Sequence, residues 1–270
     1  MPHLALGGTD ALRYEYTPPR DDIGHTVVFF NALTGSLDMW EAAIAPALRQ
    51  AGHGTLSWNF RGQADSPFSP GLRLDADLII ADARQLLEAV QAPRPVLVGL
   101  SIGGLFAART MLGGASTHGL VLVNTLRRPG PKLAWVNDAV LRAAEVGGLE
   151  LLRDLYAPLL FNAEWLAANR AASLGDGGYT PLSPEHGHYR LLSDCRTADW
   201  RLPYEFLDLP VLVVTGLQDG LFLNLHHVHE DSARLPRGRR VEFPDAAHML
   251  PAERPEAFTR VLREFLEDCP

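Results

Sequence analysis

The sequence predicts an α/β fold in which helices cover both faces of a mostly parallel sheet. Short apolar runs at Thr26–Phe30, 95–98, 120–123 and 210–215 alternate with stretches of helical periodicity, the pattern of parallel strands joined by helices. The alternation stops after the third run, because residues 126–203 contain several helix-like pieces but no convincing strand. These observations predict an α/β core that carries one helical insertion.

The remaining elements follow in chain order. Residues 4–17 are typical of an N-terminal hairpin, and a short strand is expected at 240–243, before a terminal helix. Outside the insertion we expect helices near 37–51, 75–92 and 102–113, and Asp75 is suited to open the second of these. Inside the insertion we expect helical pieces at 132–144, 149–160, 163–172 and 185–194; the first two are separated by Gly147-Gly148.

Ser101 stands at the apex of the run Gly99-Leu100-Ser101-Ile102-Gly103, between an apolar strand and a helix-favouring stretch. A sharp strand-to-helix turn lifts the serine oxygen clear of the sheet, and the N-terminus of the next helix faces it. Glycine is needed at both ends because a Cβ there would collide with the neighbouring strand or helix. The turn predicts a nucleophilic serine.

A nucleophilic serine needs a base and an acid, and in this arrangement both follow it in the chain, the acid first. Asp219 lies in a glycine-containing loop after the apolar run 210–215, and His248 follows the short strand at 240–243. The carboxyl ends of parallel strands meet at one edge of a sheet, where ligands bind. We therefore expect Ser101, Asp219 and His248 to form one catalytic site.

Two further segments match recurring motifs. The run from His248 to Phe258 is similar to a His-x4-Glu-x-Pro-x2-Phe ending, and residues 59–66 are similar to an Arg-Gly-x-Gly-x-Ser loop, with Ala64 in place of the second glycine. Together with the serine turn and the order of the acid and the base, these segments give the chain a resemblance to the α/β-hydrolase family, in its serine-hydrolase branch. The resemblance covers nearly the whole length.

The resemblance implies an eight-stranded, mostly parallel sheet. Residues 1–125 and 204–270 would form this core, and residues 126–203 would form a helical cap over the active site. Some relatives carry the catalytic acid after the strand that here spans 120–123, but this strand ends in Asn124, which cannot ionise. Asp219 is therefore the expected acid, and neither a cofactor nor a metal is expected.

The resemblance also implies an oxyanion hole built from the backbone N–H groups of Leu33 and Ile102, which would stabilise the charge on the reacting carbonyl oxygen. Most relatives carry His-Gly after the first long strand, whereas this chain has Asn31-Ala32. An asparagine at this place is similar to what 3-oxoadipate enol-lactonases carry. Asn31 is therefore a candidate for substrate binding.

The predicted cap is rich in apolar residues, some of which we expect to face the pocket and to favour an apolar acyl or alcohol group. Trp135, Tyr156 and Leu160 are the candidates for substrate binding, although the same residues would also serve to join cap and core. Arg127, Arg128 and Lys132, at the start of the cap, are suited either to hold a substrate carboxylate or to form a solvated surface.

Composition excludes several classes of partner. The 270 residues carry a net charge of −8 with acids and bases interspersed, which argues against nucleic acid or an anionic membrane. No run reaches transmembrane length and the N-terminus lacks the pattern of a signal peptide, so a cytoplasmic protein is expected. His226 and His229 share a helical face but lack further ligands at suitable spacing, so an exposed surface is favoured over a metal site. The formation of a homo-oligomer is left open.

The sequence thus predicts a serine hydrolase that cleaves a small ester or lactone through an acyl-enzyme on Ser101. His248 would take the serine proton, and Asp219 would orient the base. Three alternatives use the same fold: a carbon–carbon bond hydrolase, an acyltransferase, and a ligand receptor with vestigial turnover.

Overall fold

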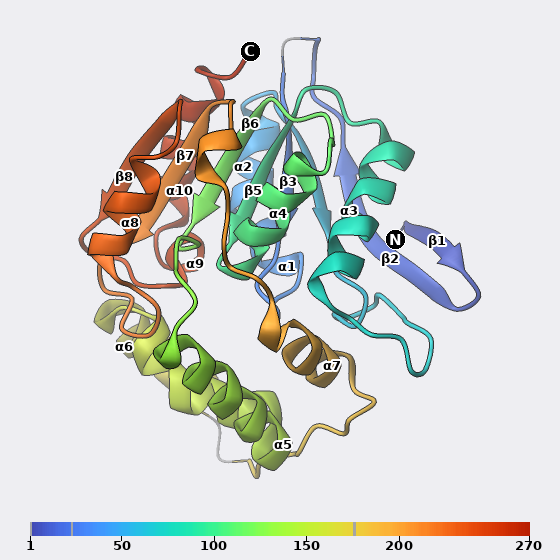
Figure 1. Ribbon diagram of the computed structural model, residues 1–270, viewed down its shortest axis with the longest axis vertical. Coiled ribbons are helices and arrows are strands. Elements are labelled where there is room, and N and C mark those ends of the chain that lie inside the picture. Colours follow the sequence, from blue (N-terminus) through green and yellow to red (C-terminus); the bar gives the residue numbers. More distant parts are fainter. Residues whose placement is uncertain (1, 23, 175–176) are drawn as a thin grey trace.

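The computed structural model describes residues 2–22, 24–174 and 177–270, and within them eight strands form one sheet (Figure 1). The order across the sheet is β1-β2-β4-β3-β5-β6-β7-β8. β2 is antiparallel to β1 and to β4, and every neighbouring pair from β4 to β8 is parallel. This confirms the predicted fold class. The strands are β1 His3–Gly7, β2 Asp10–Thr17, β3 Thr26–Phe30, β4 Gly54–Trp58, β5 Pro95–Leu100, β6 Gly119–Val123, β7 Val211–Gly216 and β8 Gly238–Phe243.

Alternating side chains of the central strands enter two hydrophobic cores, one on each face of the sheet. Val28 and Leu97 pack on the face covered by α3 Ala76–Val90 and α4 Ile102–Leu112. Val27 and Val96 pack on the opposite face, under α2 Ile44–Gln50 and α10 Pro255–Leu266. Strands buried on both faces need apolar residues throughout, which explains the continuous apolar runs in the sequence.

Parallel pairing brings the functional loops to one edge of the sheet. Leu100 pairs with Val123, Val123 with Val214, and Gly216 with Phe243, so the chain leaves these strands at the same edge. In Figure 1 the helices between β6 and β7 lie below this edge. The loops that follow β5, β6, β7 and β8 therefore converge between the sheet and these helices.

In the described residues, the segment between β6 and β7 consists of helices and the loops that connect them. It contains α5 Pro131–Leu160, α6 Ala163–Ser173, α7 Gly187–Asp194 and the short 3-10 helices Cys195–Thr197 and Tyr204–Phe206. A small core of its own includes Leu141, Ala144, Leu152 and Leu192. We refer to the helices α5, α6 and α7 as the cap helices.

The pieces expected at 132–144 and 149–160 are joined into the single kinked helix α5. Gly148 lies at the kink with φ 69°, and a Cβ there would meet the carbonyl oxygen of Thr180. The backbone of Gly148 is not helical, so the separation of two helical pieces expected at Gly147-Gly148 is present as a kink within α5. The helix expected at 37–51 is, conversely, two helices, α1 Asp38–Glu41 and α2.

Two short helices complete the fold near the C-terminal strands: α8 Leu225–Ser232 between β7 and β8, and α9 Leu250–Glu253 between β8 and α10. None of the helices in the described residues is both long enough and apolar enough to cross a bilayer.

Candidate active site

Ser101 lies in a strained turn between β5 and α4. Its φ and ψ are 58° and −123°, and its backbone N–H donates to the carbonyl oxygen of Val123 at 2.8 Å. A Cβ on Gly103 would meet the carbonyl oxygen of Phe30, and one on Gly99 would meet the backbone of α4. A non-glycine residue with positive φ is costly, and such strain collects at functional sites. The turn has the geometry of a nucleophile elbow.

Asp219 and His248 form a buried hydrogen-bonded pair. Nδ1 of His248 lies 2.6 Å from Oδ2 of Asp219, and the other carboxylate oxygen accepts the N–H groups of Leu221 and Phe222, each at 2.9 Å. Burial acts to raise the pKa of Asp219, but the charge of His248, its hydrogen bond and the Phe222 N–H outweigh burial and lower the pKa to about 2. The carboxylate therefore stays ionised and can orient the imidazole.

Asn124 follows β6, where some relatives carry the catalytic acid, and its side chain is hydrogen-bonded to three backbone groups. Its Nδ2 donates to the carbonyl oxygens of Ala247 and His248, at 3.0 and 2.8 Å, and its Oδ1 accepts the Gly216 N–H at 2.8 Å. An ionised aspartate cannot donate, so only an amide can make all three bonds. Asn124 thereby ties the ends of β6 and β7 to the loop that carries His248.

Arg127 occupies the space next to the serine. Its Nη2 donates to Oγ of Ser101 at 3.0 Å and to the carbonyl oxygen of Asn124 at 2.8 Å. Its guanidinium stacks on the rings of Trp200 and Phe222, with centroids 4.4 and 4.0 Å away. Only 7% of Arg127 is exposed, and burial lowers its pKa to about 10. In the described chain, Arg127 forms no ion pair and its buried Nε has no hydrogen-bond partner.

Phe222 connects the serine side of this cluster to the base. Its ring contacts the Arg127 guanidinium and lies 5.0 Å from the ring of His248. Among the described residues, no hydrogen bond joins Ser101 to His248, and the Ser101 hydroxyl oxygen accepts a hydrogen bond from Arg127. Catalytic hydrogen bonds often form only when substrate is bound. The serine and the Asp219–His248 pair thus share one site, in which Arg127 is the immediate neighbour of the serine.

Leu33 and Ile102, the predicted oxyanion donors, line the same narrow space of about 40 Å³, together with Val140 of α5, Leu192 of α7 and Trp200. In the described residues, neither the Leu33 N–H nor the Ile102 N–H donates to a protein acceptor. Both groups are therefore able to bind a ligand oxygen.

The loop before Leu33 is held by buried amides. Nδ2 of Asn31 donates to the Trp58 carbonyl oxygen and to Oε1 of Gln63, both at 2.9 Å, and Oδ1 accepts the Trp40 indole N–H at 2.8 Å. Nε2 of Gln63 donates to the Leu33 carbonyl oxygen at 3.1 Å. Asn31 is fully buried, so its predicted contact with substrate is corrected: its side chain supports the loop that carries Leu33.

The other three predicted substrate contacts lie on α5. Trp135 is 79% exposed and faces solvent, which corrects its assignment to the pocket. Tyr156 packs against the small core of the cap helices. Leu160 is half-buried, and its carbonyl oxygen accepts the N–H of Met249, the residue after His248.

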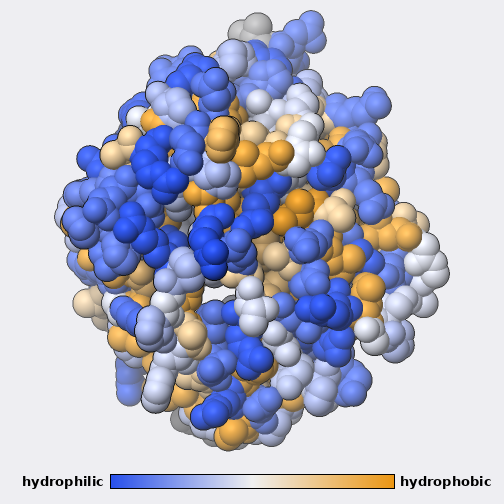
Figure 2. All heavy atoms as spheres, in the orientation of Figure 1, coloured by the Kyte–Doolittle hydropathy of each residue, from blue (hydrophilic) through white to orange (hydrophobic). Residues whose placement is uncertain are grey.

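Cavities lie on both sides of Arg127. One of about 370 Å³ is lined by Leu133 and Val136 of α5 and by Leu221 and Phe222. Another, of about 440 Å³, includes Trp200, Leu202, Tyr204 and Arg234 among its lining residues, and Arg127 itself lines both. Figure 2 shows the molecule hollowed between the sheet and the cap helices. Leu133 and Phe222, which line the first cavity, were not among the predicted substrate contacts, whereas Arg127 was a candidate for holding a substrate carboxylate.

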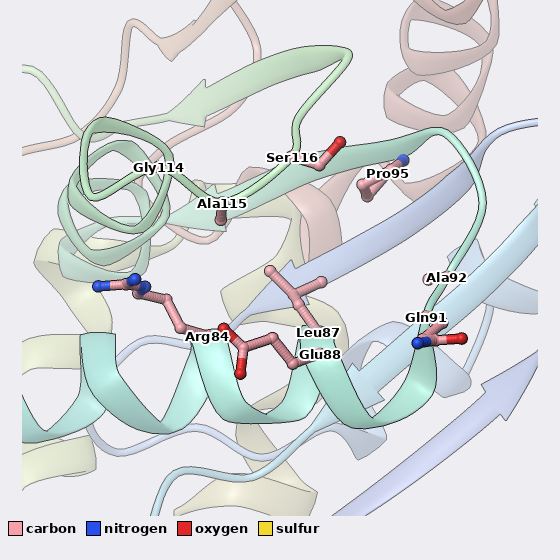
Figure 3. Close-up of a pocket in the computed structure, with 9 residues that line it drawn as sticks. All are labelled: Arg84, Leu87, Glu88, Gln91, Ala92, Pro95, Gly114, Ala115 and Ser116. Carbon is pink, nitrogen blue, oxygen red and sulfur yellow. The ribbon is translucent and has the colours of Figure 1, made fainter.

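A further cavity of about 310 Å³ lies away from this site (Figure 3). It is lined by Leu87 and Gln91 near the end of α3, by Pro95 and by Ser116. Pro95 begins β5 and Ser101 follows its end, so the two places are separated by the length of a six-residue strand, about 20 Å. This cavity is therefore at the opposite edge of the sheet.

The histidines of α8 form surface ion pairs. His229 Nε2 lies 2.7 Å from Glu242 and His226 Nε2 lies 3.3 Å from Glu230, and all four side chains are at least one-third exposed. No group of three or more His, Cys, Asp or Glu side chains within the described residues is arranged to hold a metal ion.

Comparisons with known proteins agree with this geometry. Residues 25–255 match the family model of the alpha/beta hydrolase fold. The chain is 31% identical over 217 residues to RutD of Variovorax paradoxus (strain S110), a protein named for carbamate hydrolysis, covering 78% of this chain and 79% of that protein. It is 25% identical to 3-oxoadipate enol-lactonase 2 of Acinetobacter baylyi (strain ATCC 33305 / BD413 / ADP1), covering 89% of this chain and 88% of that one.

Solved structures show the same architecture. The enol-lactonase from Burkholderia xenovorans LB400 superimposes with a TM-score of 0.81 at 24% identity, covering 98% of this chain and 100% of that one. The family resemblance predicted from the motifs is thus confirmed, and the similar proteins include enol-lactonases: the chain belongs to the alpha/beta hydrolase fold family.

Proposed function

We propose that this protein is a serine hydrolase that cleaves a small ester or lactone through an acyl-enzyme on Ser101. The observation that carries the proposal is the buried 2.6 Å hydrogen bond between Asp219 and His248, at the sheet edge where Ser101 lies in its strained turn. A base oriented by a carboxylate and a serine on a sharp strand-to-helix turn are the parts that acyl transfer requires. The names of the enol-lactonase relatives favour a lactone or ester carbonyl.

In the proposed mechanism, Nε2 of His248 accepts the proton of Ser101 as the serine oxygen attacks the carbonyl carbon. Asp219, bonded to Nδ1, keeps the imidazole in the required tautomer and stabilises the imidazolium. The N–H groups of Leu33 and Ile102 bind the oxyanion, and the protonated imidazole gives its proton to the leaving alkoxide. Water then releases the acyl group by the same steps in reverse order.

Arg127 supports a narrower substrate class within this function. A buried guanidinium without a carboxylate partner is unfavourable on its own, and this one lies next to the proposed nucleophile. Asp219 attracts Arg127 electrostatically without contacting it, whereas a substrate carboxylate would bond the guanidinium directly and would replace Ser101 as the acceptor of Nη2. We therefore include a free carboxylate close to the scissile bond among the features of the proposed substrate.

A fluorophosphonate probe tests the nucleophile. The wild-type protein should be labelled at Ser101, and the Ser101→Ala variant should not be labelled. Labelling that persists in the variant would refute the assignment.

Paired substrates test the role of Arg127. For lactones with and without a carboxylate, Arg127→Met should raise the KM of the acidic substrate by about tenfold or more, since a hydrogen bond to a charged group contributes roughly 1.5–3 kcal/mol. The neutral substrate should keep its KM. Arg127→Lys, which retains the charge but loses the planar stacking group, should recover part of the loss. An equal effect on both substrates would contradict the proposal that Arg127 binds a substrate carboxylate.

One observation favours a second candidate. Since no hydrogen bond joins Ser101 to His248 in the described residues, a hydrolase-fold ligand receptor of vestigial turnover is the second candidate. Turnover of a p-nitrophenyl ester separates the two: an enzyme continues through many cycles, whereas a receptor stops after about one equivalent of product.

A further inference from the structure

The junction between α5 and α6 is bonded directly to the loops that carry the acid and the base. The carbonyl oxygen of Leu159 accepts the N–H of Gly220, the residue after Asp219, at 2.9 Å. The carbonyl oxygen of Leu160 accepts the N–H of Met249 at 3.0 Å. The last carbonyl groups of a helix lack partners within the helix, so these two bonds satisfy the end of α5 with backbone from the catalytic loops.

Glu253 adds a side-chain bridge at the same place. Its Oε2 accepts the N–H of Asn162, which precedes α6, at 3.0 Å, and the N–H of Ala247, which precedes His248, at 2.9 Å. Glu253 is only 6% exposed. Its other oxygen, Oε1, is buried and has no hydrogen-bond partner among the described residues. Both hydrogen bonds of the Glu253 carboxylate are therefore made by Oε2 alone.

We propose that Glu253 is a positioning residue, which holds the backbone at His248 in place by bonding it to the α5–α6 junction of the cap helices. The proposal rests on the proposed function, in which His248 is the base. Hydrogen bonds to a buried carboxylate are short and strong, and two of them on one atom leave little freedom to either N–H. Movement of the junction would therefore be transmitted to the residue directly before the base.

The charge of Glu253 is consistent with this role. Burial raises the pKa of Glu253, whereas the N–H groups of Ala247 and Asn162 and the charges of Arg254 and His248 oppose that rise. The carboxylate is thus electrostatically coupled to the imidazole as well as bonded to its loop. It touches neither the serine nor the proposed substrate cavities, so its effect on the reaction must pass through His248.

Other contacts hold the junction when Glu253 is changed. Nδ2 of Asn162 donates to the carbonyl oxygen of Asp245 at 2.8 Å. Arg254 bonds Asp245 at 2.8 Å and Glu164 at 2.6 Å at the surface of the same region. Variants of Glu253 are therefore expected to fold with the cap helices attached.

The first experiment compares Glu253→Ala with Glu253→Gln on a p-nitrophenyl ester. In the alanine variant kcat should fall by about ten- to a hundredfold with KM nearly unchanged, since a small misplacement of a catalytic group can cost about a hundredfold. Glutamine retains an oxygen that can accept both N–H groups, so it should restore most of the rate. Wild-type kcat in the alanine variant, or an equal loss in both variants, would overturn the proposal.

The second experiment breaks the bond on the cap side. Asn162 has φ −72° and Phe161 is extended at φ −123° and ψ 151°, so the backbone angles at 162 suit proline, whose Cδ would take the place of the N–H hydrogen and displace the Glu253 carboxylate. Asn162→Pro loses both the N–H and the side chain, whereas Asn162→Ala loses the side chain alone. The proline variant should have a kcat about tenfold below that of the alanine variant. Equal kcat values in the proline and alanine variants would overturn the proposed link between the α5–α6 junction and His248.

A nuclear magnetic resonance measurement separates failure of this inference from failure of the proposed function. The proton between Nδ1 of His248 and Asp219 should give a low-field signal, whether or not Ser101 is a nucleophile. The signal should shift or broaden in Glu253→Ala and persist in Glu253→Gln. An unchanged signal in the alanine variant would overturn the positioning role. Absence of fluorophosphonate labelling in the wild type would overturn only the proposed function.

Discussion

The sheet and the cap helices differ in how closely packing constrains each residue. Every residue of β3, β5 and β6 is buried, and their side chains alternate between two cores. The cap helices share only a small core and leave Trp135 79% exposed and Leu155 54% exposed. The densely packed part carries the groups proposed to react, and the loosely packed part lines cavities proposed to hold the substrate. In the proposed function, chemistry and selectivity thus belong to parts that tolerate substitution to different degrees.

Two of the contacts between these parts lie close to the site and involve charged residues. On one side Arg127, in the segment between β6 and α5, reaches Ser101. On the other, Glu253 joins the α5–α6 junction to the loop of His248. A cap held at both its beginning and its middle can change its exposed surface freely, but it cannot shift far without affecting the site.

The largest effect is expected from Asp219→Asn. Asparagine can still accept the N–H groups of Leu221 and Phe222, so the loop should keep its shape, but the wrong tautomer of His248 is favoured. We expect kcat to fall by about four orders of magnitude, as for the equivalent change in serine proteases. Ester hydrolysis measures the loss and a thermal melt controls for folding. A decrease of less than about tenfold would argue against Asp219 as the acid.

Two glycine substitutions compare the packed and the open regions directly. In Gly103→Ala the new Cβ would meet the Phe30 carbonyl oxygen, which belongs to the backbone of β3 and cannot move aside. We expect a loss of about 3 kcal/mol or more in the free energy of unfolding. Gly178→Ala, between α6 and α7, has no neighbour within 4 Å and should change this free energy by less than about 0.5 kcal/mol. Urea denaturation measures both, and equal losses would contradict the comparison.

The same contrast explains what the sequence could predict. The strands, the turn around Ser101 and the loop positions of Asp219 and His248 follow from local patterns, because a parallel sheet brings successive strand ends to one edge. For Arg127 the sequence left two roles open, the binding of a substrate carboxylate and a place on a solvated surface. Its burial depends on Trp200 and Phe222, from two distant segments, and no local pattern reports such a contact.

The errors have equally specific causes. Asn31 resembles a polar ligand contact in sequence, and only the positions of Trp40, Trp58 and Gln63 reveal that its amide is fully engaged. Trp135 was expected in the pocket because it is apolar, but only one face of a helix points inward. The facing residues, Leu133 and Val136, differ from it by two positions and by one.

Three histidines at the amino edge of the sheet predict that the free energy of unfolding depends on pH. The His25 ring lies 6.2 Å from that of His53 and 6.5 Å from that of His118, and burial, followed by the charge of Arg94 for His25 and His118 and of Arg263 for His53, lowers all three pKa values.

As the pH falls below about 6.5, the unfolded chain therefore binds protons before the folded chain does. The free energy of unfolding should decrease from pH 7.5 toward the lowered pKa values and level off below them. Urea denaturation at several pH values measures the slope, which should be smaller in His118→Gln. An identical slope in that variant would show that the pH dependence arises elsewhere.

The smallest effects are expected from substitutions in α5. There the effect on KM should depend more on which face of the helix a residue occupies than on the size of its side chain. Leu133 lines the 370 Å³ cavity beside Arg127, so Leu133→Ala should raise the KM of an ester with an apolar alcohol group by about fivefold, near the 0.8 kcal/mol that each buried methylene contributes. Trp135→Ala removes a larger side chain, but one that faces solvent, and should leave KM within about twofold. Steady-state kinetics on esters of graded alcohol length compare the two variants. A greater effect at Trp135 than at Leu133 would mean that α5 turns its other face to the substrate.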